Sequence, residues 1–314
     1  MRIFHRETSI LAQRPWLDAE ERDFKEPLRA RMRRWGLGAI DASGLGYLRL
    51  LPRLAAMTVN HALSPSETLD VLAEELNYYG AKGLARFTDR LDIGSMLAAY
   101  RRGLLPACYF GSVKWRAPTL REAIGPDEFR IGGPTRRLLR EERFRVTFDN
   151  DFCGVVEGCA KGDSYLSRKL MRALWKLHQA GYAHSVEVWD DNSKLAGGLY
   201  GIAIGEVFFA ESRFTFVSKA SGIAIAVLHH HLSHWGFALR TARWVDRNQP
   251  NSGRVVSRDV FQGLLRRYAD RPGRVGRWKV EGSLNTYDWS VTLKGLRGAK
   301  TRLLPLKRAS ELTA

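Results

Sequence analysis

A single carboxylate, Glu211, follows an apolar run that begins at Val207. A lone charge that leaves water must be paired, hydrogen-bonded or shifted in pKa, because burying it costs free energy. Such positions are often functional, although a structural salt bridge at a strand end gives the same pattern in a sequence. Glu211 is therefore a candidate reactive group, and a structural ion pair is the open alternative.

Two predicted strands position this carboxylate. Apolar and polar residues alternate over 184–188, and a second apolar run begins at 199–202. Alternation with a period of two is typical of a strand with one buried face. The dipeptide Gly-Glu at 205–206 is a two-residue hairpin connection into the run that ends at Glu211. The sequence therefore predicts a β-hairpin that holds Glu211 at a strand end.

Two weaker patterns fall on a predicted helix over 218–235. His230 and His234 share one helix face at a spacing that metal-binding pairs use, but a third ligand at a defined spacing is missing, so no metal is predicted. Residues 219–224 fit K-x-x-G-x-A, which is close to the phosphate loop of acetyltransferases that bind acyl-CoA. Glycine lets backbone N–H groups at a helix N-terminus approach a pyrophosphate. Three fixed positions often occur by chance, so the specificity of this pattern is low.

The composition predicts a folded protein with a strong positive charge. Its 314 residues are 45% hydrophobic and include 50 Lys and Arg against 33 Asp and Glu, a net charge of +17. This excess favours a polyphosphate partner such as RNA, with an anionic membrane surface or a merely basic composition as alternatives. The three cysteines lack C-x-x-C spacing, which indicates neither a disulfide framework nor a zinc knuckle. The sequence shows neither a signal peptide pattern nor a run of about 18 apolar residues, so we expect a cytoplasmic protein with no membrane partner.

Basic residues gather at 1–63, at 135–143 and at 271–314. Their arginines can bind phosphates, and Trp35 can stack on a base. Solvated faces of amphipathic helices are the alternative interpretation, and the last segment can equally be a lid. The candidate RNA-binding residues are Arg29, Arg33, Arg34, Arg136, Arg137 and Arg140.

Start and stop signals place further elements along the chain. Asp92 caps a predicted helix over 93–102 that stops at Gly103, and Gly181 ends a helix that begins at 164. The other predicted elements are a helix over 64–79, a helix over 135–143, a strand over 144–148, and a C-terminal hairpin with strands at 278–284 and 289–295.

Three ordered blocks of the chain, with a weaker one upstream, have counterparts in a known family. They read FRVTFDNDFCGVVEGCA at 144–160, LHQAG at 177–181, HSVEVWDDNSKLAGGLYGIAIGEVFFAESRF at 184–214 and, upstream, LAAYRRGLLP at 97–106. In this order they resemble the leucyl/phenylalanyl-tRNA-protein transferase family. The resemblance implies an α/β fold with an acetyltransferase-like (GNAT-type) mixed sheet and flanking helices, preceded by a smaller α/β N-terminal domain.

The resemblance also implies a reaction and a domain order. Aminoacyl-tRNA would be the co-substrate, with no other cofactor, and its amino acid would move onto the N-terminal amine of a protein. The expected domains are a basic extension at 1–63, a small domain at 64–134, an acetyltransferase-like catalytic domain at 135–270 and a second basic extension at 271–314.

The chain departs from the family at the implied reaction centre. The family's L-I-D-C-Q reads LRTAR at 239–243, so Thr241 and Arg243 stand at the presumed catalytic positions beside Glu211. Glu211 can orient an ammonium or receive an amine proton, Arg243 can stabilise an oxyanion, and Thr241 can hold water. The substrate-binding positions that the resemblance implies are Tyr165, Leu199, Phe209, Ser212, Arg213 and Phe214.

Arg213 replaces a methionine of the family's side-chain pocket. It either turns toward Glu211 and favours a small amino acid, or faces inward and binds a polar or acidic one. We therefore expect a specificity altered from leucine and phenylalanine, with Leu199 and Tyr165 as apolar walls. Three functions remain open: an aminoacyl-tRNA-dependent transferase that acts on a protein N-terminus or a small-molecule amine, an acyl-CoA-dependent N-acyltransferase, and an inactive tRNA-binding relative.

Overall fold

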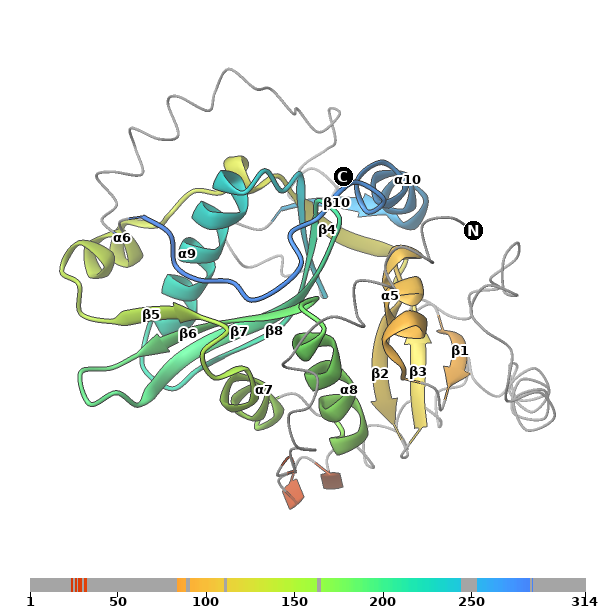
Figure 1. Ribbon diagram of the computed structural model, residues 1–314, viewed down its shortest axis with the longest axis horizontal. Coiled ribbons are helices and arrows are strands. Elements are labelled where there is room, and N and C mark those ends of the chain that lie inside the picture. Colours follow the sequence, from red (N-terminus) through yellow and green to blue (C-terminus); the bar gives the residue numbers. More distant parts are fainter. Residues whose placement is uncertain are drawn as a thin grey trace, which may run out of the picture.

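The residues that the structure describes form two β-sheets (Figure 1). The computed structural model describes residues 84–88, 91–109, 112–162, 165–243, 253–282 and 284, with residues 24, 26, 28, 29, 31 and 32. The smaller sheet is antiparallel, in the order β1-β3-β2. Its strands are β1 (Leu84–Thr88), β2 (Leu105–Tyr109) and β3 (Ser112–Arg116).

The larger sheet has seven strands in the order β10-β4-β9-β8-β7-β6-β5. All neighbours are antiparallel except β8 and β9, which run parallel. This mixed sheet confirms the predicted α/β class, while the narrower acetyltransferase-like assignment stays a prediction. The strands are β4 (Leu120–Ile124), β5 (Arg145–Phe148), β6 (Ala183–Trp189), β7 (Leu195–Ile204), β8 (Val207–Thr215), β9 (Leu239–Ala242) and β10 (Arg254–Ser257).

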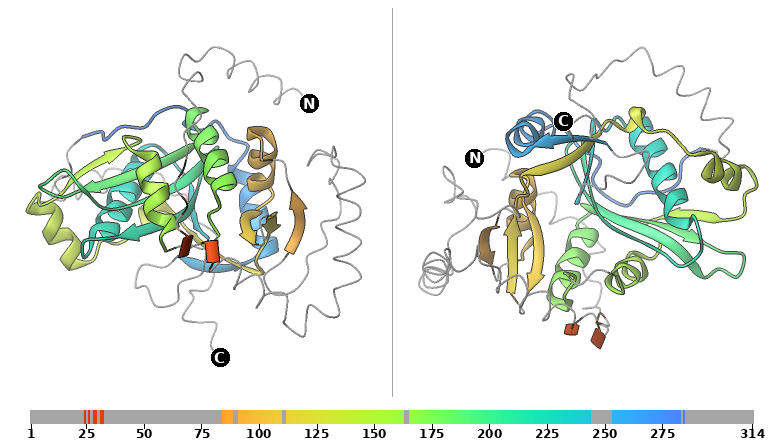
Figure 2. Two further views of the ribbon diagram at one scale, coloured as in Figure 1. Left: turned by 90° about the horizontal axis from the view of Figure 1, so that it is seen from below. Right: turned by 180° about the vertical axis from the view of Figure 1, so that it is seen from behind.

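Helices cover both faces of the larger sheet, as the two further views also show (Figure 2). Helices α7 (Phe152–Ala160) and α8 (Arg168–Gln179) pack on one face, and α9 (Ala220–His234) packs on the other. Because both faces are covered, all seven residues of β6 are buried. Among the other helices with described bounds, α5 (Ile93–Arg101) lies against the smaller sheet, η1 (Pro126–Glu128) and α6 (Gly133–Arg140) lie beside α9, and α10 (Arg258–Tyr268) lies beside β4 and β10.

The predicted hairpin around residues 205–206 is confirmed. Gly205 adopts a φ of 58°, in the left-handed region that favours glycine. A Cβ atom at this position would lie 2.5 Å from the carbonyl oxygen of Ala269. The tight connection therefore depends on glycine both for its backbone angle and for the close approach of the segment after α10.

Local capping signals correctly predicted several helix ends. Asp92 accepts a hydrogen bond from the Ser95 N–H, at 2.9 Å, at the start of α5. The helix expected from 164 instead begins after Ser167, whose hydroxyl accepts the Leu170 N–H at 3.3 Å. The helix expected over 135–143 runs from 133 to 140, and the helix expected over 218–235 runs from 220 to 234.

The strand predicted over 278–284 is wrong in the part that the structure describes, because residues 278–282 form irregular chain. The Trp278 N–H donates to the Asp149 carboxylate at 2.7 Å instead of to a neighbouring strand. The Trp278 side chain is buried in the core on the α9 side of the larger sheet, so it is also no platform for RNA bases. The predicted helix at 64–79 and strand at 289–295 lie outside the described residues.

The expected domain boundary near residue 134 remains a prediction. Strand β4, which precedes that boundary, pairs with β9 and β10 within the larger sheet. In the described residues, no helix combines the length and the apolar character needed to cross a bilayer.

Candidate active site

A cavity of about 680 Å³ opens on the α9 side of the larger sheet. Its walls come from the ends of β8 and β9, from the beginning of α9 and from the segment 129–135. Apolar lining comes from Leu199, Ile225 and Leu228, while charged groups line other parts of the wall. The volume is within the range of small-molecule sites.

Glu211 lies in the wall of this cavity because of a β-bulge. In the pairing of β7 with β8, Tyr200 faces Ser212 and Gly201 faces Ala210, which leaves Glu211 as the extra residue. A bulge interrupts the alternation of a strand and changes the direction of its side chains. The carboxylate is therefore buried at the junction between the cavity and the core, with 1% of its side chain exposed.

Arg243 is the ion-pair partner of Glu211. Its Nη1 donates to Glu211 Oε2, and its Nη2 donates to the carbonyl oxygen of Pro106 in the smaller sheet. The guanidinium also lies over the Tyr165 ring, 3.7 Å from the centroid, and the Tyr165 hydroxyl donates to the Glu211 carbonyl at 3.3 Å. The structural alternative for Glu211 is thus present in the molecule, and the same pair faces a cavity.

Burial and the charge of Glu211 both shift the pKa values of the neighbouring side chains. Burial lowers the pKa of Arg243, but the carboxylate of Glu211 together with Tyr165, Tyr100 and Tyr200 outweighs burial and raises it above the ordinary arginine value. Burial raises the pKa of Tyr100 well above its usual value, and Glu211 raises it further. Burial lowers the pKa of Arg121 to about 10, against the opposing effect of Glu211. At neutral pH both arginines are therefore charged and Tyr100 is neutral.

The residues that the resemblance implied divide between the two faces of the sheet. Besides Glu211 and Arg243, the cavity is lined by Leu199, Ser212 and Arg213. Three further positions belong instead to the core on the α7 side and are not among the lining residues: Tyr165, Phe209 and Phe214. Thr241 is fully buried, accepts a hydrogen bond from Arg121 Nη2 at 3.3 Å, and does not line the cavity either.

Arg213 does not turn toward Glu211, whose carboxylate is paired with Arg243. Its exposed side chain lines the cavity, as the second of the two expected orientations requires. This placement favours the second orientation, and the choice between the two stays a prediction.

The sequence interpretation missed Glu122 and Arg240, which form a second buried ion pair in the cavity wall. Arg240 Nη2 and Glu122 Oε1 are 2.6 Å apart. The two residues are 118 positions apart and meet because β4 pairs with β9. Arg240 belongs to the segment LRTAR at 239–243, but it is not one of the family's presumed catalytic positions there.

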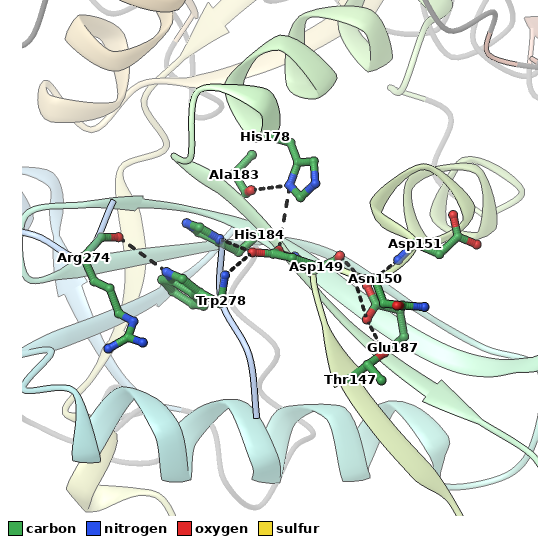
Figure 3. Close-up of polar contacts among 11 residues, drawn as sticks. Thr147, Asp149, Asn150, Asp151, His178, Ala183, His184, Glu187, Arg274 and Trp278 are labelled. Atoms are coloured by element: carbon green, nitrogen blue, oxygen red, sulfur yellow. Dashed lines mark hydrogen bonds and ion pairs between the residues drawn. The ribbon is translucent and has the colours of Figure 1, made fainter. Parts of the chain in front are cut away.

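A separate polar cluster surrounds Asp149 at the end of β5 (Figure 3). This carboxylate accepts hydrogen bonds from the Ser185 N–H, from the His184 ring and from the Trp278 N–H, at 3.0, 2.9 and 2.7 Å. Burial alone would raise the pKa of Asp149, but His184 and the other donors outweigh burial and lower it. Asp149 thus ties the segment 272–282 to the larger sheet.

Glu187 holds the neighbouring turn in the same cluster (Figure 3). Its carboxylate accepts from the Ser185 hydroxyl, from the Thr147 hydroxyl at 2.6 Å, and from the backbone N–H groups of Asn150 and Asp151. Burial raises the pKa of Glu187 against the effect of these donors. Asp149 and Glu187 therefore serve the fold, and neither of them lines the cavity.

The predicted basic contacts are exposed where the structure describes them. Arg136, Arg137 and Arg140 are exposed on α6, and Pro134 and Thr135 in the first turn of that helix line the cavity. Arg29 is likewise exposed, while the predicted contacts at 33 and 34 lie outside the described residues.

Of the two histidines predicted to share a face of α9, His230 is half-buried and His234 is exposed. Burial lowers the pKa of His230 to about 4, and the nearby His231 and His234 lower it further. In the part of the chain that the structure describes, no three His, Cys, Asp or Glu side chains are placed to hold a metal ion.

Comparisons with known proteins identify similar chains. Residues 123–266 match the sequence model described as leucyl/phenylalanyl-tRNA protein transferase. A leucyl/phenylalanyl-tRNA–protein transferase of Pseudomonas fluorescens SBW25 is 39% identical over 208 residues, which cover 62% of this chain and 89% of that relative. Proteins of the same name from Pseudomonas syringae B728a and Pseudomonas fluorescens Pf-5 are both 37% identical, over 60% and 66% of this chain and 86% and 94% of their own.

One solved structure, titled "The structure of L-PGS from Bacillus licheniformis", is also similar to this chain. The similarity covers 65% of this chain and 70% of the other, with a TM-score of 0.28 and 12% identity. At that level it supports no statement about fold or function.

Proposed function

The chain belongs to the leucyl/phenylalanyl-tRNA protein transferase family, and from this premise we propose that it is an enzyme that moves an amino acid from a charged tRNA onto an amine. The observation that carries the proposal for this chain is the Glu211–Arg243 pair in the wall of the cavity. A cavity with convergent charged groups and perturbed pKa values is what a reaction of this class requires.

The proposed reaction is attack of an amine on an activated ester. The amine nitrogen forms an amide bond with the aminoacyl carbonyl carbon, the ester bond to the ribose oxygen breaks, and the proton lost by the amine is balanced by the proton that the ribose hydroxyl gains. The enzyme must hold the two reactants together and stabilise the negative charge that develops on the carbonyl oxygen.

Arg243 is the group proposed to stabilise that oxygen. Glu211 and the Pro106 carbonyl hold two of its nitrogens, and the Tyr165 ring holds its plane, so the guanidinium is fixed before the substrate arrives. A donor that is already oriented needs no rearrangement during the reaction, and removing one such donor typically costs about 100-fold to 1000-fold in rate. Glu211 keeps Arg243 in place and, beside the cavity, can accept the proton of the attacking amine.

The exposed arginines of α6 are proposed to contact the tRNA. They lie next to the cavity residues Pro134 and Thr135, so phosphates of the tRNA end that carries the amino acid can reach them while the aminoacyl group enters the cavity. The net charge of +17 supports attraction of the whole tRNA. Thr241 lies away from the cavity, and the geometry supports a role in fixing Arg121 instead of holding water.

The acceptor in this proposal is the N-terminal amine of a protein, as the name of the relatives suggests, or a small-molecule amine. Because the proposed reaction needs charged tRNA as the donor, it favours a cytoplasmic location for the enzyme. An acyl-CoA donor remains the alternative outcome of the test, because residues 219–224 form the start of α9 beside the same cavity.

Retention of ligands by the immobilised full-length protein tests the proposal. A mixture of charged tRNAs and acyl-CoAs is applied at low salt, and the bound fraction is eluted and identified by mass. We expect charged tRNA to be retained and acyl-CoA to pass through. Retention of acyl-CoA without tRNA would replace the proposed donor.

A further inference from the structure

The Glu122–Arg240 pair gives one wall of the cavity a buried charge. Only 10% of the Arg240 side chain and 4% of the Glu122 side chain are exposed. The pair lies in the same cavity as the apolar residues Leu199, Ile225 and Leu228. A guest in this cavity thus meets aliphatic groups and a desolvated ion pair together.

Positive charge exceeds negative charge among the described residues that line the cavity. Four basic side chains stand against the two carboxylates, Glu122 and Glu211. The first turn of α9, which also lines the cavity, contains no acidic residue, and the N-terminus of a helix carries a partial positive charge. The basic side chains are Arg213, Lys219, Arg240 and Arg243.

Arg240 retains a donor that its partner does not use. Its Nη2 binds Glu122, while its Nε is buried without a hydrogen-bond partner. Burial lowers the pKa of Arg240 against the effect of Glu122, and the positive charge of Arg213 lowers it further. Both arginines also line the cavity, so an anionic group bound there would be attracted to both.

We propose that the cavity accepts an aminoacyl group whose side chain carries a carboxylate, aspartyl or glutamyl, and that Arg240 and Arg213 determine this specificity. The inference rests on the proposed function and names the substrate class of the same site. The aliphatic stem of the side chain would pack on Leu199 and Ile225, and its carboxylate would receive charge-assisted hydrogen bonds from the guanidinium groups.

Leucine and phenylalanine fit this site poorly. Either side chain would displace water from the arginines without replacing its hydrogen bonds, which leaves buried polar groups unpaired. Sites built to hydrogen-bond a substrate group reject analogues that lack it by up to about 10⁴-fold to 10⁵-fold. A lysyl or arginyl group would meet the excess of positive charge and is rejected for that reason.

Transfer from a complete set of aminoacyl-tRNAs, each preparation charged with one kind of amino acid, tests the inference, with kcat/KM measured for each amino acid. We expect glutamate or aspartate to exceed leucine and phenylalanine by at least about 100-fold, within the range for such discrimination. A matched variant removes both charges of the pair, Glu122→Met with Arg240→Met, and should shift the preference toward leucine. Arg213→Met, at an exposed position, should weaken the preference for acidic residues even if the double variant does not fold.

The outcomes separate the inference from the function on which it rests. Preferred transfer of leucine, phenylalanine, lysine or arginine by the wild type would overturn the inference and leave the transferase function standing. Transfer from none of the charged tRNAs would overturn both. An acidic preference that neither variant changes would overturn the assignment of specificity to Arg240 and Arg213.

Discussion

Replacing one partner of the Glu211–Arg243 pair should destabilise the protein strongly, whereas replacing both should not. Either single change to methionine leaves one charged group buried without its partner, since their side chains are only 1% and 2% exposed. Such an unpaired charge costs about 3–5 kcal/mol. At about 2–4 °C per kcal/mol for a chain of this size class, each single variant should melt roughly 6–20 °C below the wild type.

The double variant Glu211→Met with Arg243→Met removes both charges together. Buried ion pairs replaced by apolar groups of similar volume are often neutral in stability, so most of the decrease in melting temperature should be reversed. Thermal unfolding of the four proteins gives the coupling energy of the pair. Arg271→Met is the matched control, because Arg271 forms a 3.0 Å pair with Glu206 while 46% of its side chain is exposed, and it should change stability by less than about 1 kcal/mol.

Activity separates the chemical role of the pair from its structural role. The stable double variant should transfer amino acids at least about 100-fold more slowly, because an oriented donor and a proton acceptor are both gone. A double variant with near wild-type transfer would show that the pair serves only the fold. Additive destabilisation in the double variant would refute the ion pair itself. Glu211→Gln should resemble the single variants, because the neutral amide leaves the buried charge of Arg243 without its partner.

Three further predictions follow from other parts of the molecule. Asp149→Asn should lower the melting temperature and expose 272–282 to protease, because the variant loses the negative charge that binds the His184 ring. Asp190→Asn, at a turn residue, is the control, and equal protection of 272–282 from protease in the two variants would contradict the proposed anchoring. The free energy of unfolding should fall as the pH drops below about 6.5, because burial lowers the pKa values of His178, His229 and His231 in the folded protein, so the unfolded chain binds more protons. The lowered pKa of Asp149 adds a further decrease below about pH 4. Urea titrations from pH 7 to 5 that show constant stability would refute the histidine effect. The affinity for bulk tRNA should depend steeply on the salt concentration. Deletion of 1–63, or Arg136→Gln with Arg140→Gln, should reduce the slope of log affinity against log salt concentration by about one for each phosphate that the protein no longer binds. A slope that neither change alters would exclude these arginines as phosphate ligands.

Elements governed by local chemistry could be predicted from the sequence. The hairpin at 205–206 needs a residue with positive φ, and glycine supplies it. Asp92 marks a helix start because its short side chain reaches a backbone N–H in the first turn. The burial of Glu211 followed from its place at the end of an apolar strand.

The interior of the site could not be predicted, because it depends on contacts between distant residues. The partner of Glu211 is set by a bulge and by the parallel pairing of β8 with β9, neither of which a local pattern specifies. The partner of Arg240 comes from β4, more than a hundred residues earlier. The buried Trp278 shows the same limit, since its alternating surroundings indicate a strand while a distant aspartate takes its N–H.

Label transfer to a peptide tests the central claim most directly. A pool of tRNA charged with isotopically labelled amino acids is incubated with the full-length protein and peptides that carry a free N-terminal amine, and the same peptides are offered acyl-CoAs in parallel. We predict peptides heavier by one labelled aminoacyl group with the tRNA pool, and loss of this product in the Glu211→Met, Arg243→Met double variant. An acyl group taken from acyl-CoA, with no amino acid taken from tRNA, would contradict the proposed function.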